Sequence, residues 1–172
     1  MKPIKLTAEH KRGHRKGGFG IEVLYPGLAL GQHDTGIGAI GRIDHAKVNP
    51  GTLIAMHPHQ DDEILSYMRE GVMVHKDTVG NEEELSNVRM MMMNAGHTFQ
   101  HEEKMTGTQP IEMLQIFLRP RKKDLDAQVQ FHEFDTIKSQ DTWRLLAGPE
   151  KAPLEVRAEA WVHDAFCVQA KF

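Results

Sequence analysis

The stretch TLIAMHPHQDDEILSYMREGVMVHKDTVGN, residues 52–81, decides the fold class. It contains three short runs of apolar and β-branched residues, and the runs are separated by Gln60-Asp61-Asp62 and by Glu70-Gly71. Glycine supplies the positive φ that many tight turns need, and aspartate stabilises turns through its side chain. Apolar runs of this length, bounded by turn residues, are typical of strands. The stretch therefore predicts three consecutive β-strands.

The same pattern continues on both sides of this stretch. Helical periodicity is scarce, and the separators at residues 49–51, 78–81, 94–96 and 119–120 contain Gly, Pro or Asn, which stop a strand. Strands are predicted over residues 37–47, 52–59, 64–69, 72–76, 88–93, 98–103, 111–118 and 128–134. About eight short strands joined by tight turns predict an all-β jelly roll or small barrel.

The composition changes after residue 134. Residues 135–153 are polar and contain Gly148-Pro149, so they predict a connector, and residues 154–172 become strand-like again. A chain of 172 residues with 40% apolar content can form one compact domain and a modest addition. We therefore expect a β-domain over residues 1–134, including an N-terminal arm, and a connector with C-terminal strands over residues 135–172.

Charge and cysteine usage restrict the possible partners and compartment. The net charge of −3 gives no global electrostatic reason to expect nucleic acid or an anionic membrane as a partner. Residues 1–16 are nevertheless basic and contain glycine, which predicts a solvated arm rather than a nucleic-acid contact. No stretch resembles a signal peptide or is long enough to cross a bilayer. Because Cys167 is the single cysteine, a reducing compartment fits, and we expect a soluble cytoplasmic protein.

Two of the eleven histidines, His57 and His59, have the spacing of metal ligands. Residues i and i+2 of a strand point to the same face, so the two imidazoles project together if the alternation set by Leu53 and Ala55 continues through Pro58. Proline cannot donate to a β-ladder, so Pro58 also predicts an edge strand or a bulge at this point.

His101 and Glu103 form a second pair on one face of a later predicted strand. If the two strands meet, three imidazoles and one carboxylate converge. This donor set suits a divalent ion such as Fe(II), Mn, Ni, Cu or Zn with open positions for water or substrate, and the absence of thiolates argues against a structural zinc site. His97 lies about 13 Å from His101 along a straight strand, at roughly 3.3 Å per residue, which is too far to share one ion.

Glu63 is a further candidate because a strand break at residues 60–62 would let its carboxylate fold back towards the histidines. It could then be a fourth ligand, a hydrogen-bond partner of a ligating histidine or a surface acid, and the spacing leaves all three roles open. A His-x-His pair alone is a weak signal, because surface histidines take this spacing by chance. The His-x-Glu pair on a later strand strengthens the prediction.

Three segments around these residues are similar to the motifs of a known family. HPHQDDEILSYMREG (residues 57–71), VMVHKDTVGN (72–81) and MMMMNAGHTFQHEE (90–103) resemble the patterns HPH…E…Y…EG, H-x-D-x-x-GN and M-x-AG-x-x-x-x-H-x-E of the pirin-like proteins of the cupin superfamily. The resemblance implies a cupin β-barrel with one metal, usually iron. It implies as ligands the residues His57, His59, His101 and Glu103, and it leaves Glu63 as a partner of a ligating histidine.

The chain also departs from the family pattern. Pirin-like proteins usually contain two cupin domains, whereas here only residues 154–172 resemble the opening strands of a second one. Leu85-Ser86-Asn87-Val88 stands where a Pro-x-Gly often precedes the second motif, and the segment KRGHRKGGFG is only loosely similar to the opening of the family. Strands that end at Phe172 would expose hydrogen-bonding edges, which proteins often cover by pairing with a second copy. We therefore expect a homodimer through the C-terminal segment.

The resemblance implies two classes of function. The first is a flavonol-cleaving oxygenase of the quercetin dioxygenase kind, in which the metal acidifies a substrate hydroxyl, Glu103 or Glu63 accepts the proton, and O₂ then reacts. The second is a non-enzymatic, metal-dependent module whose Fe(II)/Fe(III) state changes its affinity for a protein partner. A metal-free cupin is a weaker third hypothesis, since all four ligand positions hold competent side chains. An apolar, solvent-open approach to the metal would favour catalysis, and a plugged barrel would favour the binding role.

Overall fold

A computed structural model describes residues 5–168, so Lys2 of the basic segment and the last four residues of the expected C-terminal strands lie outside the described residues. The described chain is almost entirely β, which confirms the predicted fold class. Its helical elements are a 3₁₀ turn, η1 (Ala8–His10), and one turn of helix, α1 (Pro26–Ala29). None of the helices among residues 5–168 is long and apolar enough to span a membrane.

The strands follow one another with short turns along the chain. They are β1 (Lys11–Lys16), β2 (Phe19–Leu24), β3 (Ile40–Val48), β4 (Leu53–His59), β5 (Glu63–Glu70), β6 (Met73–Asp77), β7 (Glu82–Leu85), β8 (Arg89–Asn94), β9 (Phe99–Met105), β10 (Ile111–Leu118), β11 (Gln128–Glu133), β12 (Arg144–Gly148), β13 (Leu154–Glu155) and β14 (Val162–Asp164). Each of the eight predicted strands corresponds to one of these, with ends that differ by a few residues.

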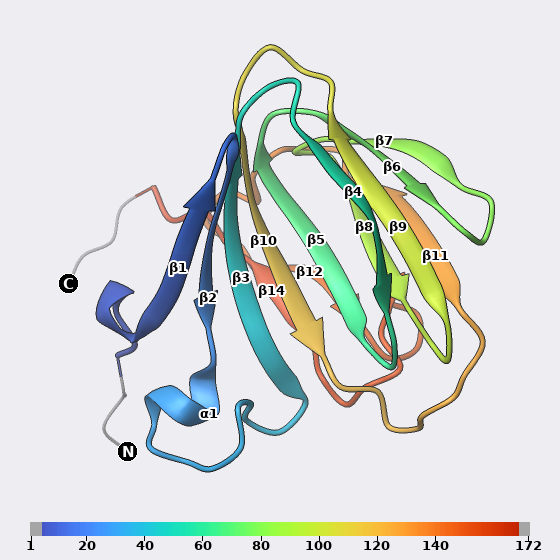
Figure 1. Cartoon of the computed structure of the whole chain (residues 1–172). Coiled ribbons are helices and arrows are strands. Elements are labelled where there is room, and N and C mark those ends of the chain that lie inside the picture. The colour runs from blue at the N-terminus through green and yellow to red at the C-terminus, as the bar shows by residue number, and fades with distance from the viewer. Residues whose placement is uncertain (1–4, 169–172) are drawn as a thin grey trace.

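Two sheets face each other and enclose the main core (Figure 1). One has seven strands in the order β1-β2-β3-β10-β5-β8-β11, and the other has four in the order β4-β9-β6-β7. Strand β9 shows how the sequence builds this barrel, because Phe99, His101, Glu103 and Met105 are buried and alternate with residues that are more exposed. Six methionines fill the interior with flexible side chains: Met68, Met73, Met91, Met93, Met105 and Met113.

The two turns of residues 52–81 contain residues that tolerate a positive φ. Gly71, between β5 and β6, has φ of 85°, and a Cβ there would lie 2.7 Å from Cγ1 of Ile111. Asp61, in the predicted break between β4 and β5, has φ of 52°, a region that aspartate tolerates better than most residues. The local sequence therefore specifies both turns that separate the three strands of residues 52–81.

The N-terminal segment differs from the prediction of a solvated arm. Residues 11–16 form β1, which pairs antiparallel with β2, and β2 pairs with β3 at the edge of the seven-stranded sheet. Gly17, with φ of 58°, lies in the tight turn of this hairpin. The arm is ordered because Phe19 of β2 packs against the main core, while the basic side chains of β1 remain on the surface.

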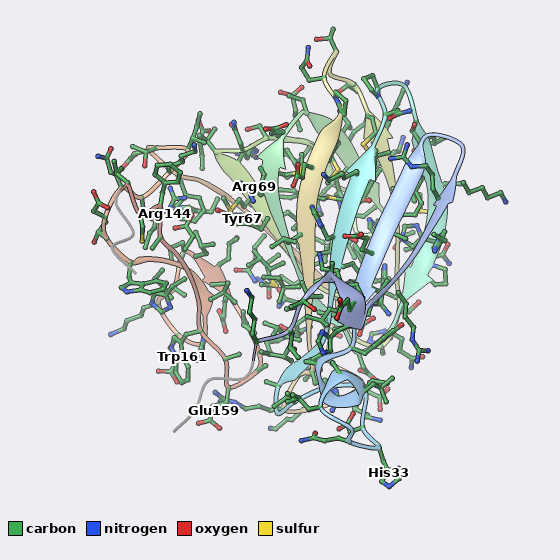
Figure 2. The ribbon with its side chains drawn as sticks, turned by 90° about the vertical axis from the view of Figure 1, so that its left-hand side faces the viewer. His33, Tyr67, Arg69, Arg144, Glu159 and Trp161 are labelled. Carbon is green, nitrogen blue, oxygen red and sulfur yellow. The ribbon has the colours of Figure 1, made fainter. Side chains whose placement is uncertain are left out.

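The predicted connector contains a strand as well. Residues 144–148 form β12, which pairs parallel with β13 and antiparallel with β14. This small sheet packs on the outer face of the barrel in a second apolar cluster, which joins Leu65 and Met92 of the barrel to Leu146 and Leu154. Figure 2 shows the C-terminal segment, with Arg144 and Trp161, beside the sheet that carries Tyr67. The hydroxyl of Tyr67 donates to Oδ2 of Asp164 at 3.0 Å.

Candidate metal centre

A bulge in β4 directs two histidines into the barrel. In the described chain β4 pairs with β9 alone, so it is an edge strand, and its register passes from Ile54 opposite Glu103 to His57 opposite His101. Three steps along β4 therefore match two along β9, which leaves one extra residue in β4. Both features predicted from Pro58, the edge position and the bulge, are present.

The bulge also corrects the predicted alternation. Leu53 and Ala55 are exposed, whereas His57 and His59 turn inwards beside the buried His101. The premise that all four residues of β4 share one face is wrong, because the extra residue reverses the phase of the strand after Ile54. The two histidines nevertheless share a face, as their spacing predicts.

Three imidazoles converge in the barrel interior. One potential ligand atom from each of His57, His59 and His101 lies within 4.8 Å of the others. The ring centres of His57 and His101 are 4.3 Å apart, and the ring of His59 is 5.1 Å from each of them. This arrangement follows from the antiparallel pairing of β4 with β9, which places His57 directly opposite His101. The three side chains are therefore close enough to hold one ion.

The protonation of these rings favours a cation as their common partner. Burial and the neighbouring histidines lower the pKa of His101 to about 2, so its ring is neutral. Neither ring nitrogen of His101 has a hydrogen-bond partner among the described residues, although both are buried. The Nδ1–H group of His57 donates to the Ala55 carbonyl at 2.9 Å, which leaves its Nε2 lone pair free. Neutral imidazoles with free lone pairs are the form that binds divalent metals, so the residues fit the metal that the family motifs imply.

Glu103 lies beside the three histidines, and a single neutral amide donates a hydrogen bond to its carboxylate. Its Oε1 accepts a hydrogen bond from Nε2 of Gln115 at 3.0 Å and lies 3.9 Å from Nδ1 of His101. The carboxyl group is 2% exposed. Burial raises the pKa of Glu103 to about 7, although the Gln115 hydrogen bond acts in the opposite direction. Glu103 is therefore adjacent to the three histidines but outside the group whose ligand atoms lie within 4.8 Å.

His75 and Asp77 belong to the same interior surface, although the spacing arguments above single out neither of them. Nε2 of the fully buried His75 donates to Oδ2 of Asp77 at 2.8 Å, and its ring lies 5.2 Å from that of His101. Burial lowers the pKa of His75, more than the Asp77 carboxylate raises it. The i, i+2 rule that identified His57 and His59 also applies to this His-x-Asp pair, so the signal was present in the sequence.

The structure does not bring Glu63 to the histidines. Its carboxylate accepts hydrogen bonds from Nε and the backbone N–H of Arg157, each at 2.8 Å, and from Nδ2 of Asn94. Arg157 belongs to the C-terminal segment on the outer face of the barrel, so Glu63 points away from the interior. His97 is exposed, with its Nδ1 bonded to the Leu125 carbonyl at 3.0 Å, as its spacing from His101 suggested.

A cavity of about 170 Å³ lies beside His59 at the same end of the barrel. The ring centre of Phe117 is 5.8 Å from that of His59, and Nδ1 of His59 lies 3.4 Å from Oδ2 of Asp62. The cavity is lined by Tyr25, Thr35, Gly41, Arg42, Asp62, Phe117, Leu118 and Arg119. Because the Arg42 side chain is 35% exposed, this lining reaches solvent. A space of small-molecule size therefore lies next to His59, although none of the three histidines lines it.

A two-sheet β-barrel with inward-facing histidines on adjacent strands defines the chain as a cupin. The family model described as Pirin matches residues 33–118, half of the chain, and these residues include all three converging histidines and Glu103. The chain belongs to the pirin family. This confirms the resemblance found in the three motifs of residues 57–103.

Known proteins resemble the chain over most of its length. It is 26% identical over 151 residues to a quercetin 2,3-dioxygenase of Escherichia coli strain K12, covering 86% of this chain and 64% of that relative, less than two thirds of its length. The crystal structure of YhhW from Escherichia coli superposes with a TM-score of 0.79 at 22% identity, covering 91% of this chain and 68% of that one. A second YhhW structure, described as a bacterial pirin in complex with nickel(II), has a TM-score of 0.77, the same identity and the same coverage. These structures confirm the fold.

Proposed function

We propose that the chain is a metal-dependent oxygenase that acts on flavonol-type, quercetin-like aromatic substrates with O₂. The observation that carries this proposal is the convergence of three histidines, of which His101 has two buried nitrogens without a partner among residues 5–168. The quercetin 2,3-dioxygenase relative supports the substrate class. The solvent-reaching cavity supports a catalytic role over a sealed barrel, because two of its lining residues, Asp62 and Phe117, lie next to the His59 ring.

The proposed ligands of a single divalent transition metal are His57, His59, His101 and Glu103. Iron(II) is our choice of metal, and Mn, Ni, Cu and Zn are alternatives that the same donors accept. When bound, such a metal supplies Lewis acidity towards a substrate hydroxyl and one-electron chemistry towards O₂. The hydrogen bond from His57 to the Ala55 carbonyl and the contact of His59 with Asp62 orient two of the rings before any metal enters.

Glu103 is the residue that we propose to accept the substrate proton. Gln115 holds its Oε1, so Oε2 is left to take the proton. In the metal-free protein burial raises the pKa of Glu103 to about 7, so its carboxyl group takes up a proton far more readily than an exposed glutamate does. The sequence also offered Glu63 for this role, but its carboxylate is engaged by Arg157 and Asn94 away from the cluster. We therefore assign the proton to Glu103.

Oxygen uptake tests the proposal. Elemental analysis of protein purified without added metal identifies the resident ion, and iron-loaded protein with quercetin should then consume O₂. The His101→Ala variant should lose both the ion and the uptake, because it removes the most deeply buried of the three nitrogen donors. His33→Ala is the matched control, since His33 is exposed and belongs to an outlying loop. Uptake that does not exceed that of His101→Ala would remove the oxygenase proposal.

A non-enzymatic, redox-sensitive binding module is the second candidate. The observation that favours it is the exposure of Leu53 and Met56, 54% and 41%, on the same edge strand as His57. A change in the oxidation state of the metal would act directly on the strand that presents this apolar surface. Hydrogen exchange of the β4 amides should then differ between the Fe(II) and Fe(III) forms. Equal exchange in both forms would count against the regulatory role.

We also propose that the protein is a homodimer through its C-terminal segment. Trp143, Trp161 and Phe166 of this segment are 76%, 57% and 43% exposed, an unusual exposure for large aromatic side chains. Light scattering at micromolar concentration should give twice the chain mass, and Trp143→Ser combined with Trp161→Ser should give the monomer mass. A monomer for the parent protein at that concentration would contradict the proposal.

A further inference from the structure

The cavity beside His59 has its own recognition chemistry. Strands β4 and β10 end, and β3 begins, at one end of the barrel (Figure 1), so these strands bring His59, Phe117 and Arg42 together. Asp62 and Phe117 both line the cavity and both lie near the His59 ring. A molecule in the cavity would therefore sit next to a proposed metal ligand.

Arg42 is held rigidly but keeps hydrogen-bonding capacity. Its Nε donates to Oδ2 of Asp44 at 3.1 Å, and its guanidinium carbon lies 3.7 Å from the centre of the Phe117 ring. These two contacts orient the guanidinium plane. No side chain or carbonyl within residues 5–168 accepts a hydrogen bond from its Nη1 or Nη2. Arg119, on the same cavity, differs because both of its terminal nitrogens are bonded to Asp34.

The charges around the cavity disfavour an anionic ligand. Arg42 is paired with Asp44, and Arg119 is paired with Asp34, so these four charges cancel in pairs. Asp62 remains, and no arginine or lysine of the described residues pairs with its carboxylate, whose neighbour is Nδ1 of His59 at 3.4 Å. A ligand carboxylate would therefore meet an unbalanced negative charge. A neutral hydroxyl fits better, because its oxygen can accept from Arg42 while a hydroxyl hydrogen is donated to Asp62.

The size of the cavity matches one aromatic ring. A cavity of about 150 Å³ in another protein holds one benzene molecule, and the cavity here has about 170 Å³. We propose that this cavity binds a neutral dihydroxyphenyl (catechol) ring, with Arg42 donating to one hydroxyl and Asp62 accepting from the other. The inference rests on the proposed function in that it names the part of the aromatic substrate that lies beside the metal: quercetin carries such a ring next to its reacting ring system.

Binding of catechol to the metal-free protein tests this inference without turnover. Vicinal hydroxyls chelate iron, so the titration is run with excess chelator and followed by NMR of the backbone amides. We expect shifts at Gly41, Asp62 and Arg119, which line the cavity, and none at Gly20 in the N-terminal hairpin. The matched probes are 1,2-dimethoxybenzene, which cannot donate a hydrogen bond, and benzoate, which is anionic. Both should bind at least fivefold more weakly than catechol.

Variants separate the two polar contacts. Arg42→Gln should weaken catechol binding at least tenfold, and Asp62→Asn should weaken it severalfold while improving benzoate binding. Arg42→Lys keeps a cation for the buried Asp44 but loses the planar fork, so it should also weaken binding if Arg42→Gln does not fold. Arg15→Gln, on the exposed hairpin, is the control and should bind within twofold of the parent.

The outcomes of this titration and of the oxygen assay are independent. Catechol that shifts none of the cavity amides, or that binds the folded Arg42 and Asp62 variants within twofold of the parent, would overturn the assignment of the cavity. Absence of quercetin turnover in the iron-loaded protein would overturn the oxygenase and leave the binding result unaffected.

Discussion

Glu103 and Glu63 are both buried carboxylates of the barrel strands, but they lie on opposite sides of its wall and have different surroundings. Glu63, fully buried, receives three hydrogen bonds, two of them from Arg157. Glu103, 2% exposed, receives one hydrogen bond from a neutral amide and faces the ring of His101. A buried carboxylate that a cation or several donors stabilise is a structural feature, whereas one with a single neutral donor retains a raised pKa and the capacity to react. The comparison therefore separates the structural outer face from the candidate site inside.

Removing the cation from Glu63 should have the largest effect. Arg157→Leu leaves a buried carboxylate without its charge partner, which we expect to lower the free energy of unfolding by about 3–5 kcal/mol. Urea denaturation of the metal-free protein measures the loss. Glu63→Gln combined with Arg157→Leu should recover part of it, because the uncompensated charge is then absent. Arg12→Leu, on the exposed β1, is the control. A loss below about 1 kcal/mol would show that Glu63 does not depend on Arg157.

The position of Glu63 shows where spacing stops being informative. Glu63 and Arg157 are 94 residues apart, and nothing in the local pattern of either segment pairs them. The strand that includes Glu63 was predicted from residues 64–69, whose alternation places Ile64 and Met68 in the core. By the same alternation Glu63 belongs to the outer face, so its direction could be predicted, but its partner could not.

The interior histidines were predictable because strict alternation is a local property. His101 and Glu103 follow β9 without interruption, as period two requires. The phase of β4 was not predictable, since the bulge depends on pairing with β9. The N-terminal hairpin was missed for a similar reason. Its basic and glycine-rich composition resembles a flexible segment, and only the packing of Phe19 on the core and the pairing of β2 with β3 order it.

The pH dependence of stability should report Glu103 directly. Its pKa is about 7 in the folded protein and has an ordinary value of 4.5. Between these values the folded state holds the proton that the unfolded state has released, so this group makes stability fall as pH rises from about 4.5 to about 7 and level off above that. Glu103→Gln removes this decline. Relative to the parent, the metal-free variant should gain about 2–3 kcal/mol between pH 5 and pH 8.

Urea denaturation at the two pH values, in the presence of chelator, measures the difference. Glu133→Gln is the matched control, because Glu133 is an exposed glutamate at the end of β11 and its substitution should leave the pH profile unchanged. Parallel profiles for Glu103→Gln and the parent would mean that Glu103 ionises normally. Glu103 would then not differ from Glu63 in the way that the comparison of the two carboxylates requires.

Asp77 is a third buried carboxylate, and it tests whether hydrogen bonds alone can take the place of a cation. Its Oδ1 accepts from the backbone N–H groups of Val79, Gly80 and Asn81, and its Oδ2 accepts from His75 and from the Asn81 side chain. These donors overcome the effect of burial and lower the pKa of Asp77. Asp77→Asn keeps an acceptor for the backbone groups but turns an amide N–H₂ towards two other donors. We expect a loss of about 1–2 kcal/mol, smaller than that of Arg157→Leu, because no uncompensated charge is created.

Metal affinity of the same variant completes the comparison. Asp77 orients His75, whose ring lies 5.2 Å from that of His101, so the substitution disturbs the surroundings of the proposed ligands without changing any of them. Affinity for Fe(II) or Ni(II), measured by titration, should therefore fall by about tenfold, the size of effect seen when residues that orient metal ligands without binding the metal are replaced. A loss as complete as that of His101→Ala would place the His75–Asp77 pair among the ligands themselves, and a fourth donor would then have to be sought in His75 rather than in Glu103.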